Sequence, residues 1–217
     1  MIDTQALISQ LTSRAQPVRR LTSPLRRTLL WVVLAVAVIA VVIANYGLRP
    51  GFASSAPKAI EWIGSVLTAL LAAYAVFQIS VPGRSPSWAW LPLPPMLLWL
   101  SGLGWGCARE FLQFGNTALA FQTASWECAQ AITLISLPLG LILLLMVRHA
   151  GVVRPAPTAM LAALSAAAMS AAGVSLFHEG ESALMVLVWH VGAVAVLSLL
   201  CLLSGRHLFA WIGQARR

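Results

Sequence analysis

Six hydrophobic stretches dominate this chain, and each is long enough to cross a lipid bilayer as a helix. A bilayer core about 30 Å thick takes about 20 apolar residues in a helix. The chain has 217 residues, of which 59% are hydrophobic and only 9% are charged, whereas soluble domains carry about 25% charged residues. The sequence therefore predicts an all-α polytopic membrane protein, a six-helix bundle within residues 28–205. The stretches run over residues 29–48, 60–81, 88–105, 129–147, 158–177 and 183–203.

The basic residues lie mostly on one side of this predicted bundle. With six spans, both termini share one side, and that side carries Arg14, Arg19, Arg20, Arg26, Arg27, Arg84, Arg148, Arg154, Arg206, Arg216 and Arg217. Only Arg49, Lys58 and Arg109 fall on the other side. Cytoplasmic loops are enriched in Lys and Arg, so we expect both termini in the cytoplasm. Orientation thereby explains the net charge of +8, and we expect no direct contact with nucleic acid.

Residues 1–27 are the only sizeable part of the chain that suits water. Asp3 is a candidate N-cap, and Leu7, Ile8 and Leu11 follow it at helical spacing. A helix of about three turns is marginal alone in water, so we expect it to be ordered only against a partner or a surface. Its apolar face suits the groove of a partner protein, and it equally suits the inner leaflet of the membrane. Residues 206–217 form a basic cytoplasmic tail.

The fifth hydrophobic stretch, residues 158–177, consists almost entirely of small residues. Ala162, Ala166 and Ser170 are spaced by four, so they share one helix face. Small residues let neighbouring helices approach closely in a membrane. We therefore predict that this helix lies at the centre of the bundle. The sequence leaves the oligomeric state open, a homo-oligomer included.

The outer side of the predicted bundle gathers the reactive side chains. They are Cys107, Arg109, Glu110, Glu127, Cys128, His178, Glu179 and Glu181. Thiolate, imidazole and carboxylate groups together suit a soft or borderline divalent metal. The same residues equally suit a polar cap without a ligand. Cys107 and Cys128 are also compatible with a disulfide bond in an oxidising compartment.

His190 stands apart because it lies inside the sixth apolar stretch. An ionisable group at such a depth is costly and by default indicates function. The alternative is a neutral imidazole that is hydrogen-bonded to a neighbouring helix. The sequence contains no nucleotide-binding loop, metalloprotease helix or G-x-S-x-G elbow, so we expect no enzymatic activity. A small-solute or metal-ion transporter that uses the outer Cys, His and Glu residues remains an alternative reading.

Several short motifs follow one another along the chain. The start has the form M-x-x-T-x-x-L-I-x-x-L over residues 1–11, followed by P-V-R-x-L-x-x-P-x-R over residues 17–26. Further matches are V-P-G-R at 81–84, W-L-x-G-L-x-x-G-C-x-R-E at 99–110, S-L-P at 136–138, S-A-L-x-V-L-V-W-H at 182–190 and G-R-x-L at 205–208. In this order the motifs resemble those of the NrsF family of membrane anti-sigma factors, and the similarity covers essentially the whole chain. No single motif is a catalytic signature, so the order and spacing carry the resemblance.

The resemblance implies a negative regulator of an extracytoplasmic-function sigma factor in the bacterial inner membrane. The cytoplasmic N-terminus would hold the sigma factor through Leu7, Ile8, Leu11, Val18, Arg19 and Leu21 until a signal arrives from outside. In the family, one cysteine at the start of the fourth span and another in the loop before the sixth are associated with sensing metals or oxidative stress. Cys128 matches the first position. At the second position this chain has His178 and Glu179 instead of a cysteine, so it departs from a two-thiol sensor. The alternatives are a mixed site of Cys128 with His178 and an unrelated signal, with a divalent metal as a candidate signal and no resident cofactor implied.

Overall fold

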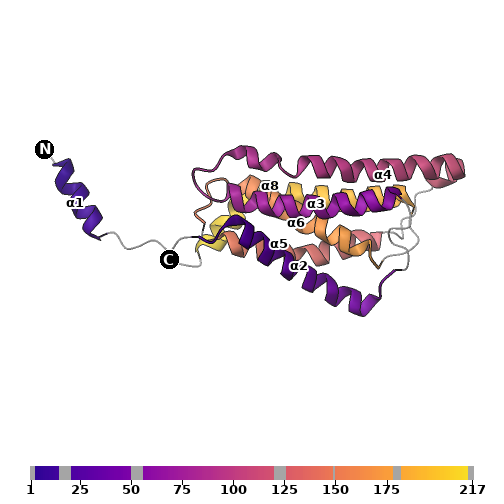
Figure 1. Ribbon diagram of the computed structural model, residues 1–217, viewed down its shortest axis with the longest axis horizontal. Coiled ribbons are helices and arrows are strands. Elements are labelled where there is room, and N and C mark those ends of the chain that lie inside the picture. Colours follow the sequence, from indigo (N-terminus) through magenta and orange to yellow (C-terminus); the bar gives the residue numbers. More distant parts are fainter. Residues whose placement is uncertain are drawn as a thin grey trace.

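The computed structural model is a bundle of long helices that lie side by side (Figure 1). It describes residues 3–14, 21–49, 56–119, 126–148, 150–177 and 182–214, and these residues contain helices and turns but no strand. The long helices are α2 (Pro24–Tyr46), α3 (Ala56–Ile79), α4 (Leu93–Phe114), α5 (Trp126–Val147), α6 (Pro155–Val174) and α8 (Gly192–Gln214). The short α7 (Ala183–Val186) runs through a π-helical turn, Leu187–Val191, into α8. The predicted all-α fold is confirmed.

Five helical segments in the described residues are long and apolar enough to cross a membrane. They are α2, α3, α5, α6 and the continuous segment Ala183–Trp211. The third predicted span corresponds to α4, which has 22 residues but also carries Arg109 and Glu110 in its last turns. Those charges and the glycines before them make α4 less apolar than the others. A sixth crossing therefore stays a prediction.

Prolines set the start of α4. A 3₁₀ helix, η1 (Pro86–Trp90), precedes it, and α4 begins at Leu93 and runs on to Phe114. Pro94 and Pro95 lie in its first turn, where a missing amide donor leaves no intrahelical hydrogen bond unmade. Trp88, the predicted first residue of this span, belongs to η1 and not to α4. The chain thus turns at its proline-rich segment before it enters the long helix.

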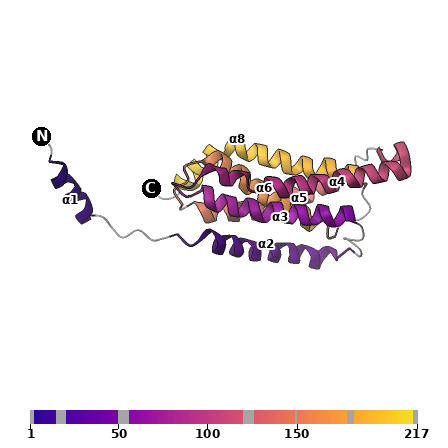
Figure 2. The same ribbon diagram turned by 45° about the horizontal axis from the view of Figure 1, so that its top comes forward.

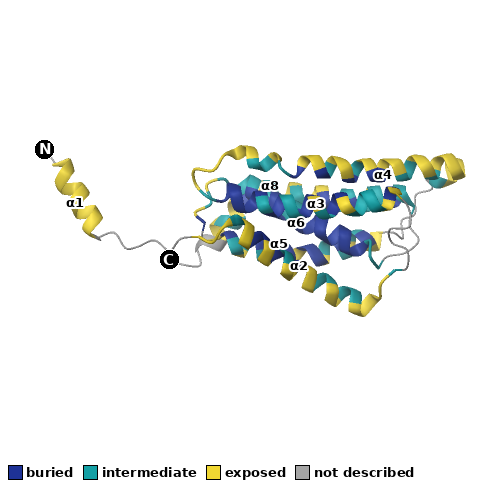
Figure 3. Ribbon diagram, in the orientation of Figure 1, coloured by how far each residue is buried: buried dark blue, intermediate teal, exposed yellow. Residues whose placement is uncertain are grey.

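Helix α6 lies at the centre of the bundle, as its small residues predict. In its 18-residue apolar stretch 78% of the residues are buried inside the protein, compared with 22% in that of α2. Figure 3 shows this contrast in the exposure of the two helices. The Ser165 hydroxyl donates to the backbone carbonyl oxygen of Ala69 on α3 at 2.7 Å. The Trp62 indole on α3 donates to the carbonyl oxygen of Ala172 at 3.2 Å. These bonds satisfy polar groups where lipid offers no partner, and they fix α3 against α6.

Two glycines bring α3 and α4 into backbone contact. A Cβ atom added at Gly102 would lie 2.7 Å from the backbone nitrogen of Glu61, and one added at Gly64 would lie 2.6 Å from the Cα of Trp99. Only glycine fits such an approach without displacing backbone. The contact holds the first turns of α3 beside the middle of α4, next to a cavity with polar walls.

The N-terminal helix α1 (Thr4–Arg14) lies apart from the bundle (Figure 2). The Asp3 carboxylate accepts a hydrogen bond from the backbone nitrogen of Gln5 at 3.0 Å, as expected of an N-cap. All described side chains of residues 3–13 are exposed, Leu7, Ile8 and Leu11 among them. Leu21 is also exposed, whereas Val18 and Arg19 lie outside the described residues.

Candidate functional site

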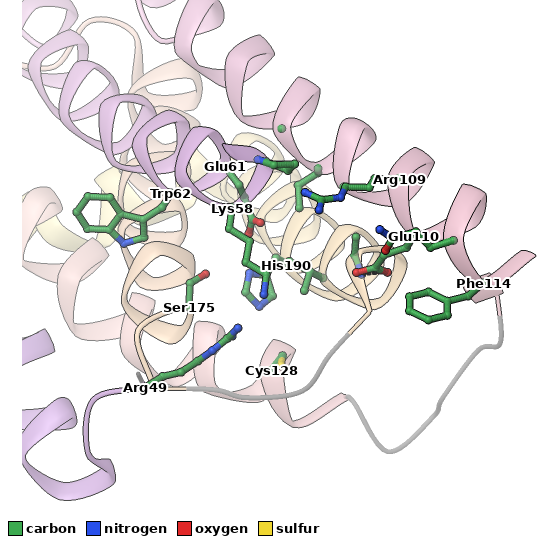
Figure 4. A pocket seen from close by; sticks show the side chains of 17 residues that line it. Arg49, Lys58, Glu61, Trp62, Arg109, Glu110, Phe114, Cys128, Ser175 and His190 are labelled. Atoms are coloured by element: carbon green, nitrogen blue, oxygen red, sulfur yellow. Dashed lines mark hydrogen bonds between the residues drawn. The ribbon is translucent and has the colours of Figure 1, made fainter. Parts of the chain in front are cut away.

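A cavity of about 290 Å³ opens at the end of the bundle where α2 finishes and α3 begins. Figure 4 shows its polar side chains from several helices around one space. The charged, imidazole and thiol groups of its wall are those of Arg49, Lys58, Glu61, Arg109, Glu110, Cys128 and His190. We call this space, defined by those seven residues, the outer cavity. It has the size of a small ligand pocket.

Helix α3 supplies one wall of the outer cavity from its first two turns. Lys58, Glu61 and Trp62 lie within four helix positions of each other, so they share one side of α3. The positive charges of Lys58 and of Arg49, which follows α2, act on the Glu61 carboxylate. The Trp62 indole is tied to α6 through its bond to Ala172, so this wall is anchored to the centre of the bundle.

Helix α4 supplies a second wall of the outer cavity, and a hydrogen bond connects α4 to α7. The Glu110 carboxylate accepts a hydrogen bond from the backbone nitrogen of Ala183 at 2.8 Å. Ser182 also accepts one from the backbone nitrogen of Met185, so both side chains satisfy amides at the start of α7. Gly106 lets α4 come close, because a Cβ at that position would lie 3.2 Å from the Cβ of Ala183. Glu110 therefore has a structural partner already.

His190 and Cys128 enter the outer cavity from the remaining helices. His190 belongs to the π-helical turn Leu187–Val191 and is only 3% exposed. Single π-turns inside α-helices frequently occur at functional sites. Cys128 lies in the first turn of α5 and is 1% exposed. The structure thus brings together two of the residues that the sequence singled out for metal or thiol chemistry.

The other predicted sensor residues lie elsewhere. Cys107 is half-buried on α4 and Glu127 is exposed at the start of α5, and neither lines the outer cavity. His178 and Glu179 lie outside the described residues. Cys107, Cys128 and Cys201 form no disulfide bond with one another. Within the described ranges, no group of three or more His, Cys, Asp or Glu side chains is placed to hold a metal ion.

The sequence did not single out Arg49, Lys58 or Glu61 as parts of a site. Arg49 and Lys58 flank the connection between the first two spans, and Glu61 lies in the first turns of α3. One signal was present: Lys58 and Glu61 introduce two charges, three residues apart, at the start of an apolar stretch. Because their partners come from α4, α5 and the π-turn, no local pattern could identify the cavity.

Comparison with known protein families identifies a match. Residues 11–211 match a protein family described as negative regulator of sigma F, NrsF. No curated protein and no solved structure matches the chain. The match covers nearly the whole chain and confirms the resemblance carried by the sequence motifs, so the chain belongs to the NrsF family.

Proposed function

We propose that this protein is a membrane anti-sigma factor that holds an extracytoplasmic-function sigma factor through its cytoplasmic N-terminus. The observation that carries the proposal is the exposure of Leu7, Ile8 and Leu11 on a helix that lies apart from the bundle. Membership of a family of negative regulators of a sigma factor supports the same partner class. The family match begins at residue 11. The proposed roles of Leu7 and Ile8 are therefore supported by their exposure on α1 and not by this match.

An apolar face on a short helix suits binding in a groove. Leu7 and Leu11 are one helical turn apart, and Ile8 lies beside them. Such anchors give affinity once the helix is ordered by contact with the partner. Val18, Arg19 and Leu21 extend the proposed sigma-binding segment toward α2. The bundle then serves as an anchor in the bacterial inner membrane, with α4 as its sixth crossing and both termini in the cytoplasm.

The test is capture of the sigma factor by the full chain. Leu7→Asp combined with Leu11→Asp places two charges on the proposed face, and we expect it to abolish capture and repression without affecting insertion. Ser9→Asp combined with Ser13→Asp adds the same charge to the opposite side of α1 and serves as the matched control. Repression that survives the first pair would show that the sigma factor binds elsewhere.

We further propose that the signal enters at the outer cavity. Cys128 and His190 supply a thiol and an imidazole there, which suits a divalent metal or an oxidant as the stress signal. Helix α3 runs from this cavity to the other end of the bundle, where its last turns contact the start of α2. A shift of α3 thus reaches the segment that carries the sigma-binding residues.

A transporter is the second candidate, and the same cavity is its only support. Deletion of residues 1–12 separates the two functions. An anti-sigma factor loses repression when this segment is removed, whereas a transporter that uses His190 keeps its transport activity in proteoliposomes.

A further inference from the structure

The outer cavity carries charges of both signs that face one space. Arg49, Lys58 and Arg109 supply basic groups, and Glu61 supplies a carboxyl group. Within the described residues, the side chains of Lys58, Glu61 and Arg109 make no ion pair with one another within 4.0 Å. Lys58 and Glu61 nevertheless act on each other through space. The cavity wall therefore presents separated opposite charges.

Separated charges are costly at the edge of a membrane, because each must be hydrated or paired. Glu110 meets this need through its bond to Ala183. No comparable hydrogen bond involves Glu61, Lys58 or Arg109 in the described part of the chain. Lys58 and Arg109 are exposed, whereas Glu61 is half-buried, and Gly102 brings α4 directly against the backbone of Glu61. The backbone contact fixes where Glu61 and α4 lie relative to each other, so a ligand with complementary charges meets a defined wall.

We propose that the outer cavity binds a small zwitterion. Its anionic group, a carboxylate or phosphate, lies against Lys58 and Arg109, and its ammonium group lies against Glu61. The volume of about 290 Å³ admits a molecule the size of an amino acid or a phosphoethanolamine headgroup. Trp62 also lines the cavity, and its indole is directed toward α6, where it donates to the carbonyl oxygen of Ala172.

Binding of the zwitterion does not require the proposed anti-sigma function. Only its consequence, regulation of sigma-factor release, rests on that function. A ligand that binds only the folded protein raises its melting temperature, because it stabilises that state by RT ln(1 + [L]/Kd). The measurement uses the full chain in a maltoside detergent, without any sigma factor. Failure of the ligand site and failure of the anti-sigma function are therefore separate results.

The probes are glycine and O-phosphoethanolamine. The controls, which carry charge of one sign only, are acetate, inorganic phosphate and methylammonium. We expect the melting temperature to rise with the logarithm of the zwitterion concentration once this exceeds the dissociation constant, and not to rise with a control at equal concentration. A rise with acetate or phosphate that equals the zwitterion's would define a simple anion site and overturn the proposal. The absence of any rise would overturn it as well.

Variants assign the effect to the cavity. Glu61→Gln and Lys58→Met should each weaken zwitterion binding at least tenfold. Arg109→Gln changes an exposed position, so we expect this variant to fold. It therefore still tests the site if Glu61→Gln fails to fold. Arg84→Gln, at an exposed position in the turn between α3 and η1, is the control and should bind like the unmodified chain. Unchanged affinity in both Glu61→Gln and Arg109→Gln would exclude the site.

Nanodiscs distinguish a lipid headgroup from a free zwitterion. If the source is a lipid, discs that contain phosphatidylethanolamine should stabilise the chain relative to phosphatidylglycerol discs, and Glu61→Gln should remove the difference. If the source is a free molecule, added glycine should stabilise the chain equally in both discs. Either result supports the site, and the lack of both contradicts it.

Discussion

The Arg27 guanidinium lies over the aromatic ring of Phe77, with its central carbon 4.8 Å from the ring centroid. Its Nη2 also donates to the backbone carbonyl oxygen of Phe77 at 3.2 Å. Arg27 is only 6% exposed, and its Nε and Nη1 are buried without a hydrogen-bond partner in the described structure. This contact joins the first turn of α2, directly after the proposed sigma-binding segment, to the last turn of α3.

Replacement of Arg27 should therefore depend strongly on the shape of the new side chain. Arg27→Ala removes the packing, the hydrogen bond and the cation–π contact, and we expect it to lower the free energy of unfolding by about 1–3 kcal/mol. Arg27→Met keeps an apolar chain of similar length and removes the poorly paired charge, so it should be nearly neutral or stabilising. Thermal unfolding in detergent measures both. Arg26→Ala, at the exposed neighbouring position, is the control, and equal losses in the Ala and Met variants would contradict this account.

The glycine contact between α3 and α4 gives a second prediction. Gly102→Ala places a Cβ atom 2.7 Å from the Glu61 backbone nitrogen, and overpacking of this kind costs about 1–3 kcal/mol. We expect a lower melting temperature and a disturbed outer cavity. Gly104 is two residues away on α4, and a Cβ there meets no atom within 4 Å. Gly104→Ala should therefore be neutral or stabilising by up to about 1 kcal/mol. If the two substitutions behave alike, the helices do not pack through Gly102.

Much of the fold is predictable because lipid imposes one simple rule. Apolar length locates the helices, and the small residues of α6 place it at the centre, since only small side chains permit close neighbours on several sides. The start of α4 is less predictable. The apolar pattern extends back to Trp88. Because Pro92, Pro94 and Pro95 restrict the backbone, however, the long helix begins only at Leu93. Local stereochemistry there overrides the hydrophobic pattern.

The site is predictable only in its residue types. Cys128 and His190 stand out because a thiol and an imidazole are unusual in apolar helices. Their common place in the outer cavity, together with Glu61 of α3 and Arg109 of α4, depends on the packing of α3, α4, α5 and the π-turn. That packing is set by contacts such as those of Gly102 and Glu110, which have no periodic signature. The π-turn itself has no sequence rule that places it at Leu187–Val191.

The burial of Cys128 predicts a size-dependent reactivity. Its side chain is 1% exposed although it lines the outer cavity, so a small thiol reagent should modify it faster than a bulky maleimide. If Cys128 carries the signal, Cys128→Ser should retain repression and lose induction by the oxidant or metal. Cys201→Ser, which changes a thiol of α8 outside the outer cavity, is the control and should respond normally. Unchanged induction in Cys128→Ser would remove Cys128 from the sensing step.

The topology of α4 decides whether both termini can share the cytoplasm. Helix α4 runs beside α3 and has 22 residues, within the range of 20 to 29 residues of the five apolar segments, but its charges at Arg109 and Glu110 lower its hydropathy. We expect it to cross, since these charges lie near its end, where side chains reach the interface. Alkaline phosphatase fused after Phe114 should then be active, whereas fusions after Arg84 and Arg148 should be inactive. Equal activity at Arg84 and Phe114 would mean that α4 does not cross. The bundle would then have five crossings, and α1 and the end of α8 would lie on opposite sides of the membrane, because an odd number of crossings separates the two ends of a chain.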